Sequence, residues 1–162
     1  MPTIKQIKLS SANVFKKLSD IQHGTLLQIA TSMSTVETCL RAKSKFDDKN
    51  ASGVVILEGE NAGRFLKNDD IKDFPVIDLT NLAELAINVL SPQFGMNDQS
   101  VAGCVYIATN CDGGTFQTMA VGWDLKMDFV IGHVWLDGPS KGLIEQVTEK
   151  MYLGTAIVNY IN

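Results

Sequence analysis

The apolar residues in the first half of the chain follow a strand pattern. Between residues 25 and 79, short segments rich in β-branched and apolar residues alternate with turn-forming stretches such as DDKNASG, GENAG and KNDD. Short segments bounded by turn residues are typical of strands in a small barrel or curled sheet. The predicted strands are TLLQIA, TVETCLRA, SGVVILEG, GRFLK and FPVIDL. We therefore expect residues 17–80 to form a small barrel-like β structure, preceded by an N-terminal arm or strand over residues 1–16.

The second half combines three strands with two segments of helical periodicity. The strands VAGCVYIAT, TFQTMAVGW and FVIGHVWLD predict a β-meander. The segment DLTNLAELAINVLSPQF carries a helical apolar stripe with Asn81 as a possible N-cap, and PSKGLIEQVTEKMYL carries a second stripe that Gly154 ends. SSANVFKKLSDI predicts a further short helix near the N-terminus.

The expected fold class is therefore α+β, mostly antiparallel β, with a small barrel-like N-terminal half and a β-meander plus two or three helices. Residues 81–162 are predicted to run helix, meander, helix and finally an edge strand, TAIVNYI. The sequence leaves open whether the two halves are separate domains or share one core.

Composition places the chain among ordinary globular proteins. It has 162 residues, 45% of them hydrophobic and 20% charged, which is enough to bury a core and argues against disorder. The net charge of −4 disfavours nucleic acid as a partner. Only Arg41 and Arg64 are arginines, which makes a dedicated phosphate-binding surface less expected.

Charge is unevenly distributed along the chain. Residues 1–45 hold seven Lys or Arg and two Asp or Glu, a net +5, whereas residues 46–100 hold four and ten, a net −6. The basic N-terminal segment reads either as a solvated face or as a docking arm for an acidic surface, such as the one around Asp69, Asp70 and Asp73. The docking-arm residues would be Lys5, Lys8, Lys16 and Lys17.

The cysteines and the N-terminus predict a cytoplasmic protein. Three cysteines form no even disulfide framework, no secretory signal sequence is evident, and no stretch of about 20 apolar residues predicts a membrane span. No nucleotide-binding glycine motif is present, so no cofactor is expected.

Two segments in the first half have a characteristic placement of turns. LSDIQHGTLLQI followed by GVVILEGENAGRFL is similar in turn placement to the small β-barrel modules of phage-encoded accessory and structural proteins, over residues 17–79. The resemblance implies a viral accessory or virion protein, and it transfers no catalytic residue to this chain.

The stretch CVYIATNCDGG offers the best catalytic hypothesis. Cys111 could act as a nucleophile with His133 as base and Asp137 as the group that orients the base, because His133 and Asp137 share one face of a predicted strand. The competing interpretation is a β-hairpin whose turn is NCDGG, since Gly113 and Gly114 accept positive φ. The hairpin is favoured because no cysteine-hydrolase signature surrounds Cys111.

Metal binding is poorly supported by the spacing of candidate ligands. Cys104, Cys111 and His133 lack the short spacings of a zinc site. The stretch DDKNASGVVILE nearly fits a calcium loop, with Asp48, Asn50 and Ser52 in ligand positions, but Gly59 stands where the bidentate acid belongs. We expect no metal site.

Aromatic residues concentrate in the C-terminal strands. Trp123, Trp135 and Phe129 are core candidates that could also line a ligand pocket or a subunit interface. Taken together, the sequence favours a non-enzymatic binding or assembly protein that forms a homo-oligomer or pairs with other proteins. The resemblance to phage proteins implies a viral origin, with virion or host proteins as partners. The alternatives are a small cytosolic hydrolase dependent on cysteine and histidine, a protein that sequesters a small host ligand, and a nucleic-acid binder that uses Lys5, Lys8, Lys16 and Lys17.

Overall fold

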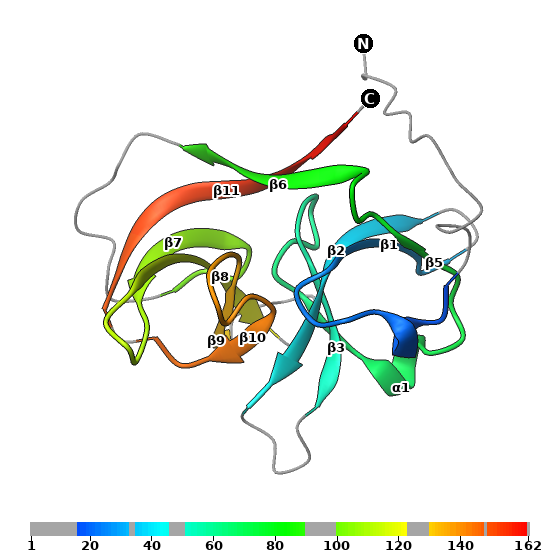
Figure 1. The fold of residues 1–162 in the computed structure, drawn as a ribbon, viewed down its shortest axis with the longest axis horizontal. Coiled ribbons are helices and arrows are strands. Elements are labelled where there is room, and N and C mark those ends of the chain that lie inside the picture. The colour runs from blue at the N-terminus through cyan, green and yellow to red at the C-terminus, as the bar shows by residue number, and fades with distance from the viewer. Residues whose placement is uncertain are drawn as a thin grey trace.

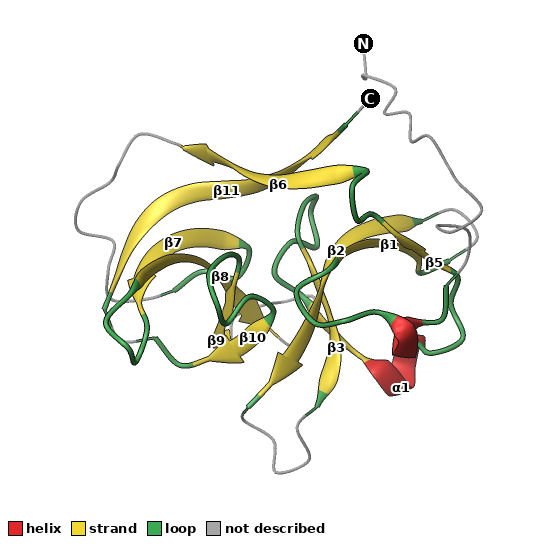
Figure 2. Cartoon of the chain, in the orientation of Figure 1, coloured by secondary structure: helices red, strands yellow, loops and turns green. Residues whose placement is uncertain are grey.

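Strands dominate the chain in the computed structural model, which describes residues 16–32, 35–45, 51–89, 100–122, 130–147 and 149–161. Of these residues, 56% lie in strands and 6% in helices. The described helices are a 3-10 turn, η2 (Leu18–Asp20), and a four-residue helix, α1 (Asn68–Ile71) (Figure 2). The predicted α+β class with two or three helices is therefore wrong, and the described chain is a mostly β protein.

One sheet of eleven strands contains all the described strands. Its main path runs β4-β3-β2-β10-β9-β8-β7-β11-β6, and β1 and β5 extend it from β2. The strands are β1 (Leu26–Ala30), β2 (Val36–Ser44), β3 (Ser52–Ile56), β4 (Phe65–Lys67), β5 (Val76–Asp78), β6 (Ala83–Val89), β7 (Cys104–Thr109), β8 (Thr115–Gly122), β9 (Val130–Trp135), β10 (Leu143–Glu145) and β11 (Lys150–Tyr160). In Figure 1, β7 to β10 lie on one side, β1, β5 and α1 on the other, and β2 and β3 between them.

The strand β2 changes partner halfway along one edge. Its first residues pair antiparallel with β1, and Lys43 and Ser44 pair parallel with β10. The change occurs at Arg41, whose backbone carbonyl accepts from Gly24 N at 2.8 Å, while Lys43 N donates to Gly142 O at 2.8 Å. A Cβ on Gly142 would overlap Gly24, so the segment before β1 and the segment before β10 are in van der Waals contact here. The opposite edge of β2 pairs with β3.

The central strands are buried on both faces. Leu40 and Ala42 of β2 face a large core that also contains Val105, Val134 and Val158 from the second half of the chain. The other face of the same strands packs on a smaller core. That core contains Leu18, Ile21, Leu27, Ile29, Cys39, Val54, Ile56, Ile71 and Val76. Burial on both faces explains why SGVVILEG reads as a continuous apolar run rather than as an alternating one.

The buried guanidinium of Arg41 hydrogen-bonds to three segments that pack around the middle of β2. Arg41 is 4% exposed, yet it has hydrogen-bond partners on three segments. Its Nε donates to Ile21 O at 3.2 Å, and its Nη1 donates to Gly53 O at 2.9 Å and to Asn68 Oδ1 at 2.6 Å. Burial of a charged group is costly unless it is hydrogen-bonded in this way.

The helix predicted from DLTNLAELAINVLSPQF is wrong where the structure describes it. Residues 83–89 form β6, which pairs antiparallel with β11 over seven positions from Ala83↔Tyr160 to Val89↔Gly154. Ala83, Leu85 and Ile87 turn toward the large core, which is the alternation of a strand. The spacing of the apolar residues in this segment fits both a helix, with a period of about 3.6 residues, and a strand, with a period of two. Pairing with β11 selects the strand.

The helix predicted over residues 139–153 is wrong for a related reason. Gly142 has φ +89°, which a right-handed helix does not accept, and the residues around it form a turn, then β10 and the first part of β11. The final strand is also not an edge, because β11 pairs with β7 on one side and β6 on the other. Of the predicted N-terminal helix, the described part contains the single turn η2.

The barrel-like form predicted for the N-terminal half is wrong as well, although the positions of its strands are confirmed. The five strands predicted between residues 25 and 79 coincide with β1 to β5. They do not close on themselves, because β2 continues into β10 and Arg64 forms a parallel bridge with Gly122 at the end of β8. No helix in the described part of the chain is long and apolar enough to cross a membrane.

The bridge between the two halves gives a testable prediction about Gly63. A Cβ at Gly63 would overlap the backbone of Gly103, whereas a Cβ at Gly59 meets nothing within 4 Å, and both glycines have φ +89°. We expect Gly63→Ala to lower the free energy of unfolding by about 1–3 kcal/mol more than Gly59→Ala does, because both carry the same backbone strain but only the first adds an overlap. Urea denaturation of the two variants measures the difference, and equal losses would contradict the close contact.

Candidate functional site

The turn between β7 and β8 presents Cys111 at the surface. Asn110 Oδ1 accepts hydrogen bonds from Asp112 N at 3.1 Å and Gly114 N at 2.8 Å, and Gly113 has φ +84°. The register Thr109↔Thr115 closes a β-hairpin around this turn. The thiol of Cys111 is exposed, so the hairpin carries an accessible sulfur at its tip.

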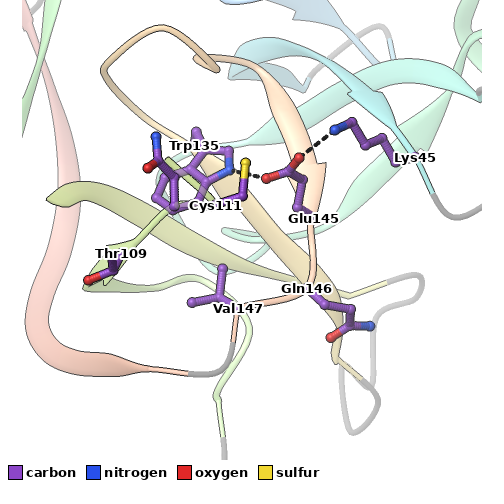
Figure 3. Close-up of a pocket in the computed structure, with 8 residues that line it drawn as sticks. Lys45, Thr109, Cys111, Trp135, Glu145, Gln146 and Val147 are labelled. Carbon is purple, nitrogen blue, oxygen red and sulfur yellow. Dashed lines mark hydrogen bonds and ion pairs between the residues drawn. The ribbon is translucent and has the colours of Figure 1, made fainter. Parts of the chain in front are cut away.

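A pocket of about 420 Å³ lies below this turn (Figure 3). It brings together Cys111 and Trp135, two residues that the sequence singled out for different reasons. The rest of its wall comes from the end of β2, the end of β7 and the segment around β10. The lining residues are Lys45, Thr109, Asn110, Cys111, Trp135, Glu145, Gln146 and Val147. Because Trp135 is only 1% exposed, its indole forms the floor of the pocket and offers no free face for stacking.

Glu145 organises the charge of this pocket. Its Oε1 accepts from Lys45 Nζ at 2.6 Å, and its Oε2 accepts from Trp135 Nε1 at 2.9 Å. Burial would raise the pKa of Glu145, but the hydrogen bonds from Lys45 and Trp135 hold this pKa below its ordinary value. The hydrogen bond to Glu145 raises the pKa of Lys45. Both groups are therefore charged at neutral pH, and both oxygens of the carboxylate are already occupied.

His133 does not line this pocket, although it pairs across the sheet with Glu145, and its imidazole lies in a clamp of hydroxyl groups. Its Nε2 is 2.8 Å from Ser100 Oγ and its Nδ1 is 3.0 Å from Thr118 Oγ1. The ring of Tyr106 packs edge-on at a centroid distance of 5.3 Å. Burial, and secondarily the charge of Lys150, lowers the pKa of His133 to about 4, so the imidazole is neutral at pH 7.

The catalytic constellation proposed for Cys111, His133 and Asp137 is not assembled in this arrangement. Both ring nitrogens of His133 are engaged by hydroxyls, and Asp137 Oδ1 accepts from Gln117 N at 2.8 Å. Ser100 and His133 resemble a nucleophile and base, but no carboxylate orients the ring, and Val101 N already donates to the Tyr106 hydroxyl at 3.0 Å. The clamp stabilises a neutral histidine more readily than it supports nucleophilic catalysis.

The candidate metal ligands are also dispersed. Burial raises the pKa of Cys104, and the described residues contain no cluster of three or more His, Cys, Asp or Glu side chains that could hold an ion. For the calcium-loop hypothesis, Asp48 and Asn50 lie outside the described residues, and Ser52 begins β3.

The other predicted binding residues are only partly described. Trp123, Phe129, Lys5 and Lys8 lie outside the described residues. Lys16 forms an ion pair with Asp78 of its own chain at 3.0 Å, and its backbone N donates to Val76 O. Lys17 is exposed. The described part of the predicted arm is therefore attached to β5 rather than to the acidic residues Asp69, Asp70 and Asp73.

A second pocket, of about 290 Å³, was not predicted from the sequence. It lies between the β1–β2 connection, β2, the β3–β4 hairpin and α1, and it includes Glu37, Arg64 and Phe74. The sequence indicates nothing about Arg64 beyond its being one of two arginines. No local signal marks this site, because its walls come from segments that are far apart in the sequence.

Comparison with protein-family models, with curated proteins and with solved structures finds no match for this chain. The function must therefore be argued from the geometry itself.

The His133 clamp predicts that the protein loses stability in mild acid. The folded-state pKa of about 4 lies below the ordinary value of 6.5, so protonation favours the unfolded state. The stabilisation is complete above pH 6.5 and is lost as the pH falls toward 4, by about 3 kcal/mol in total. Urea denaturation at a series of pH values measures this slope.

Variants of the two histidines show which of them causes the loss of stability at lower pH. The pKa of His23, which is more exposed, is also lowered, by burial and then by Arg41 and Lys43. We expect His133→Phe to flatten the slope between pH 6.5 and 5 and His23→Asn to leave most of it. A slope that survives His133→Phe would show that other groups are responsible.

Proposed function

We propose that this chain is a non-enzymatic binding and assembly protein that forms a homo-oligomer by pairing β6 with β6 of a second copy. The observation that carries the proposal is the position of β6. It ends the path of the sheet, and within the described residues β11 is the strand that pairs with it. Figure 1 shows β6 running along the top of the molecule beside β11.

The edge of β6 lacks the features that normally prevent pairing between molecules. Its sequence, AELAINV, contains one charged residue and no Pro or Lys. Proteins usually protect a long free edge with charges, proline, bulges or a covering segment. Val89, at the end of β6, is 61% exposed, and Ile157 of the neighbouring β11 is 37% exposed. A seven-residue apolar edge of this kind favours addition of another strand.

The sequence of β6 is complementary to itself when two copies pair antiparallel about Ala86. In that register Leu85 lies opposite Ile87 of the second copy, and Ala83 opposite Val89. Apolar side chains that face each other across strands stabilise a pair, and opposed like charges destabilise it. The single charge, Glu84, lies opposite Asn88 and not opposite its own equivalent. The occupant that fits this edge is therefore a second copy of the chain.

Sequestration of a small ligand is the second candidate, because the described residues form two pockets with polar and apolar walls. A hydrolase is less well supported, since His133 is engaged by Ser100 and Thr118 and does not meet Cys111. A viral accessory or structural role stays a prediction from the resemblance over residues 17–79. A cytoplasmic location, and other virion or host proteins as partners, stay predictions from the sequence.

Substitution at the centre of β6 tests the proposed assembly. We expect the chain to dimerise with increasing concentration, measured by analytical ultracentrifugation up to about 1 mM because a single edge pair forms a small interface. Ala86→Lys places two ammonium groups opposite each other and should abolish the dimer. Ile157→Lys is the matched control. Ile157 pairs with Ala86 from the interior strand β11, so this substitution adds the same charge on the same face of the sheet but away from the free edge of β6.

A charge-swap experiment excludes misfolding as the explanation. Mixing Ala86→Lys with Ala86→Glu should restore a heterodimer, since opposite charges then face each other across the pair. A wild-type chain that stays monomeric throughout the series would overturn the proposal. So would a dimer that Ala86→Lys does not weaken.

A further inference from the structure

Arg64 lines the pocket between β2, the β3–β4 hairpin and α1, and its side chain has a buried hydrogen-bond donor without a partner. The Nε atom of Arg64 is inaccessible to solvent and makes no hydrogen bond. A buried unsatisfied donor costs free energy, and such atoms are few in native proteins. The backbone of Arg64 is fixed by hydrogen bonds from Ile56 N to its carbonyl at 3.0 Å and from its own N to Asn61 O at 3.1 Å. The hairpin therefore fixes the backbone position from which the Arg64 side chain lines the pocket.

The same pocket contains two carboxylates that do not neutralise this arginine. Glu37 and Asp70 both line the pocket, and the described part of the chain shows no ion pair between either of them and Arg64. Glu37 Oε1 accepts from Asn61 Nδ2 at 3.2 Å, which orients the carboxylate. The charge of Glu37 adds to burial in raising the pKa of neighbouring Cys39. Positive and negative groups thus face one cavity from separate positions.

The floor of the pocket is apolar. Ile56 and Ile71 are each 2% exposed, and Leu66 and Phe74 are partly buried beside the smaller core. These residues line the cavity together with the charged groups. A ligand that fits must therefore present a positive group, a negative group and an apolar body within one small molecule. The volume of about 290 Å³ lies at the small end of the range for ligand pockets.

We propose that this pocket binds a free α-amino acid with an apolar side chain. The α-carboxylate accepts hydrogen bonds from the terminal nitrogens of the Arg64 guanidinium, since Arg64 lines the pocket while its Nε is buried. The α-ammonium group lies toward Glu37 and Asp70. The side chain packs on Ile56, Leu66 and Phe74. This arrangement pairs the guanidinium of Arg64 with a carboxylate, the acceptor that an arginine fork matches best, and it pairs the carboxylates of Glu37 and Asp70 with an ammonium group.

Titration with L-leucine tests the proposal on the intact chain. Backbone amide shifts in ¹H–¹⁵N spectra locate the ligand, and the expected shifts lie at Glu37, Asn61 and Arg64 rather than at Cys111 or Glu145. We expect Arg64→Met to weaken binding by about 10–100-fold, because a charge-assisted hydrogen-bonded pair is lost. Lys72→Met is the matched control, since Lys72 is an exposed cation next to α1 and does not line the pocket.

Analogues of the ligand make the test independent of how the variants fold. Leucinamide lacks the carboxylate, 4-methylpentanoate lacks the ammonium group and glycine lacks the apolar body. On the unmodified protein each should bind at least about 10-fold more weakly than L-leucine, because each leaves one set of pocket groups unpaired.

Three outcomes would overturn the assignment. One is the absence of saturable shifts with L-leucine, which would show that the pocket does not bind an amino acid. Another is equal binding of L-leucine and 4-methylpentanoate, which would remove Glu37 and Asp70 from recognition. The third is a set of shifts centred on the pocket of Cys111 and Trp135.

Discussion

The structure depends on the change of partner at the middle of β2. One edge of this strand pairs with β1 before Arg41 and with β10 after it. The segments that lead into β1 and β10 must therefore both fit beside Arg41. Glycine at positions 24 and 142 permits the backbones to meet, because a Cβ at either would crowd its neighbour. The Arg41 side chain then hydrogen-bonds to Ile21, Gly53 and Asn68, so one buried cation connects the smaller core to the centre of the sheet.

The two pockets lie at opposite ends of this same strand. Glu37, near the start of β2, lines the pocket that contains Arg64, and Lys45, just beyond its end, lines the pocket that contains Trp135. Each pocket is completed by a segment from a different sheet partner, the β3–β4 hairpin in one case and β10 in the other. The strand that unites the two halves therefore also positions both candidate binding sites on one rigid element.

Polar residues at the centre of the protein contrast with those at the pockets. Arg41 and His133 are buried, and Arg41 Nε and Nη1 and both ring nitrogens of His133 have hydrogen-bond partners, so these side chains stabilise the fold. Arg64 retains an unpaired Nε beside a cavity, and β6 retains an edge that no described residue pairs with. A partner strand that adds to an unpaired sheet edge gains backbone hydrogen bonds, and this supports the binding function that we propose.

The sequence by itself determined the features that depend on neighbouring residues. The strands between residues 25 and 79 and the hairpin turn at 110–114 follow from β-branched runs and from glycine at the required φ, which act locally. Only the tertiary structure decided that AELAINV is a strand. The spacing of its apolar residues fits both a helix and a strand, and pairing with β11, which is distant in the sequence, selects the strand. The pockets likewise required the fold, since their walls become neighbours only when β2 exchanges one strand partner for another.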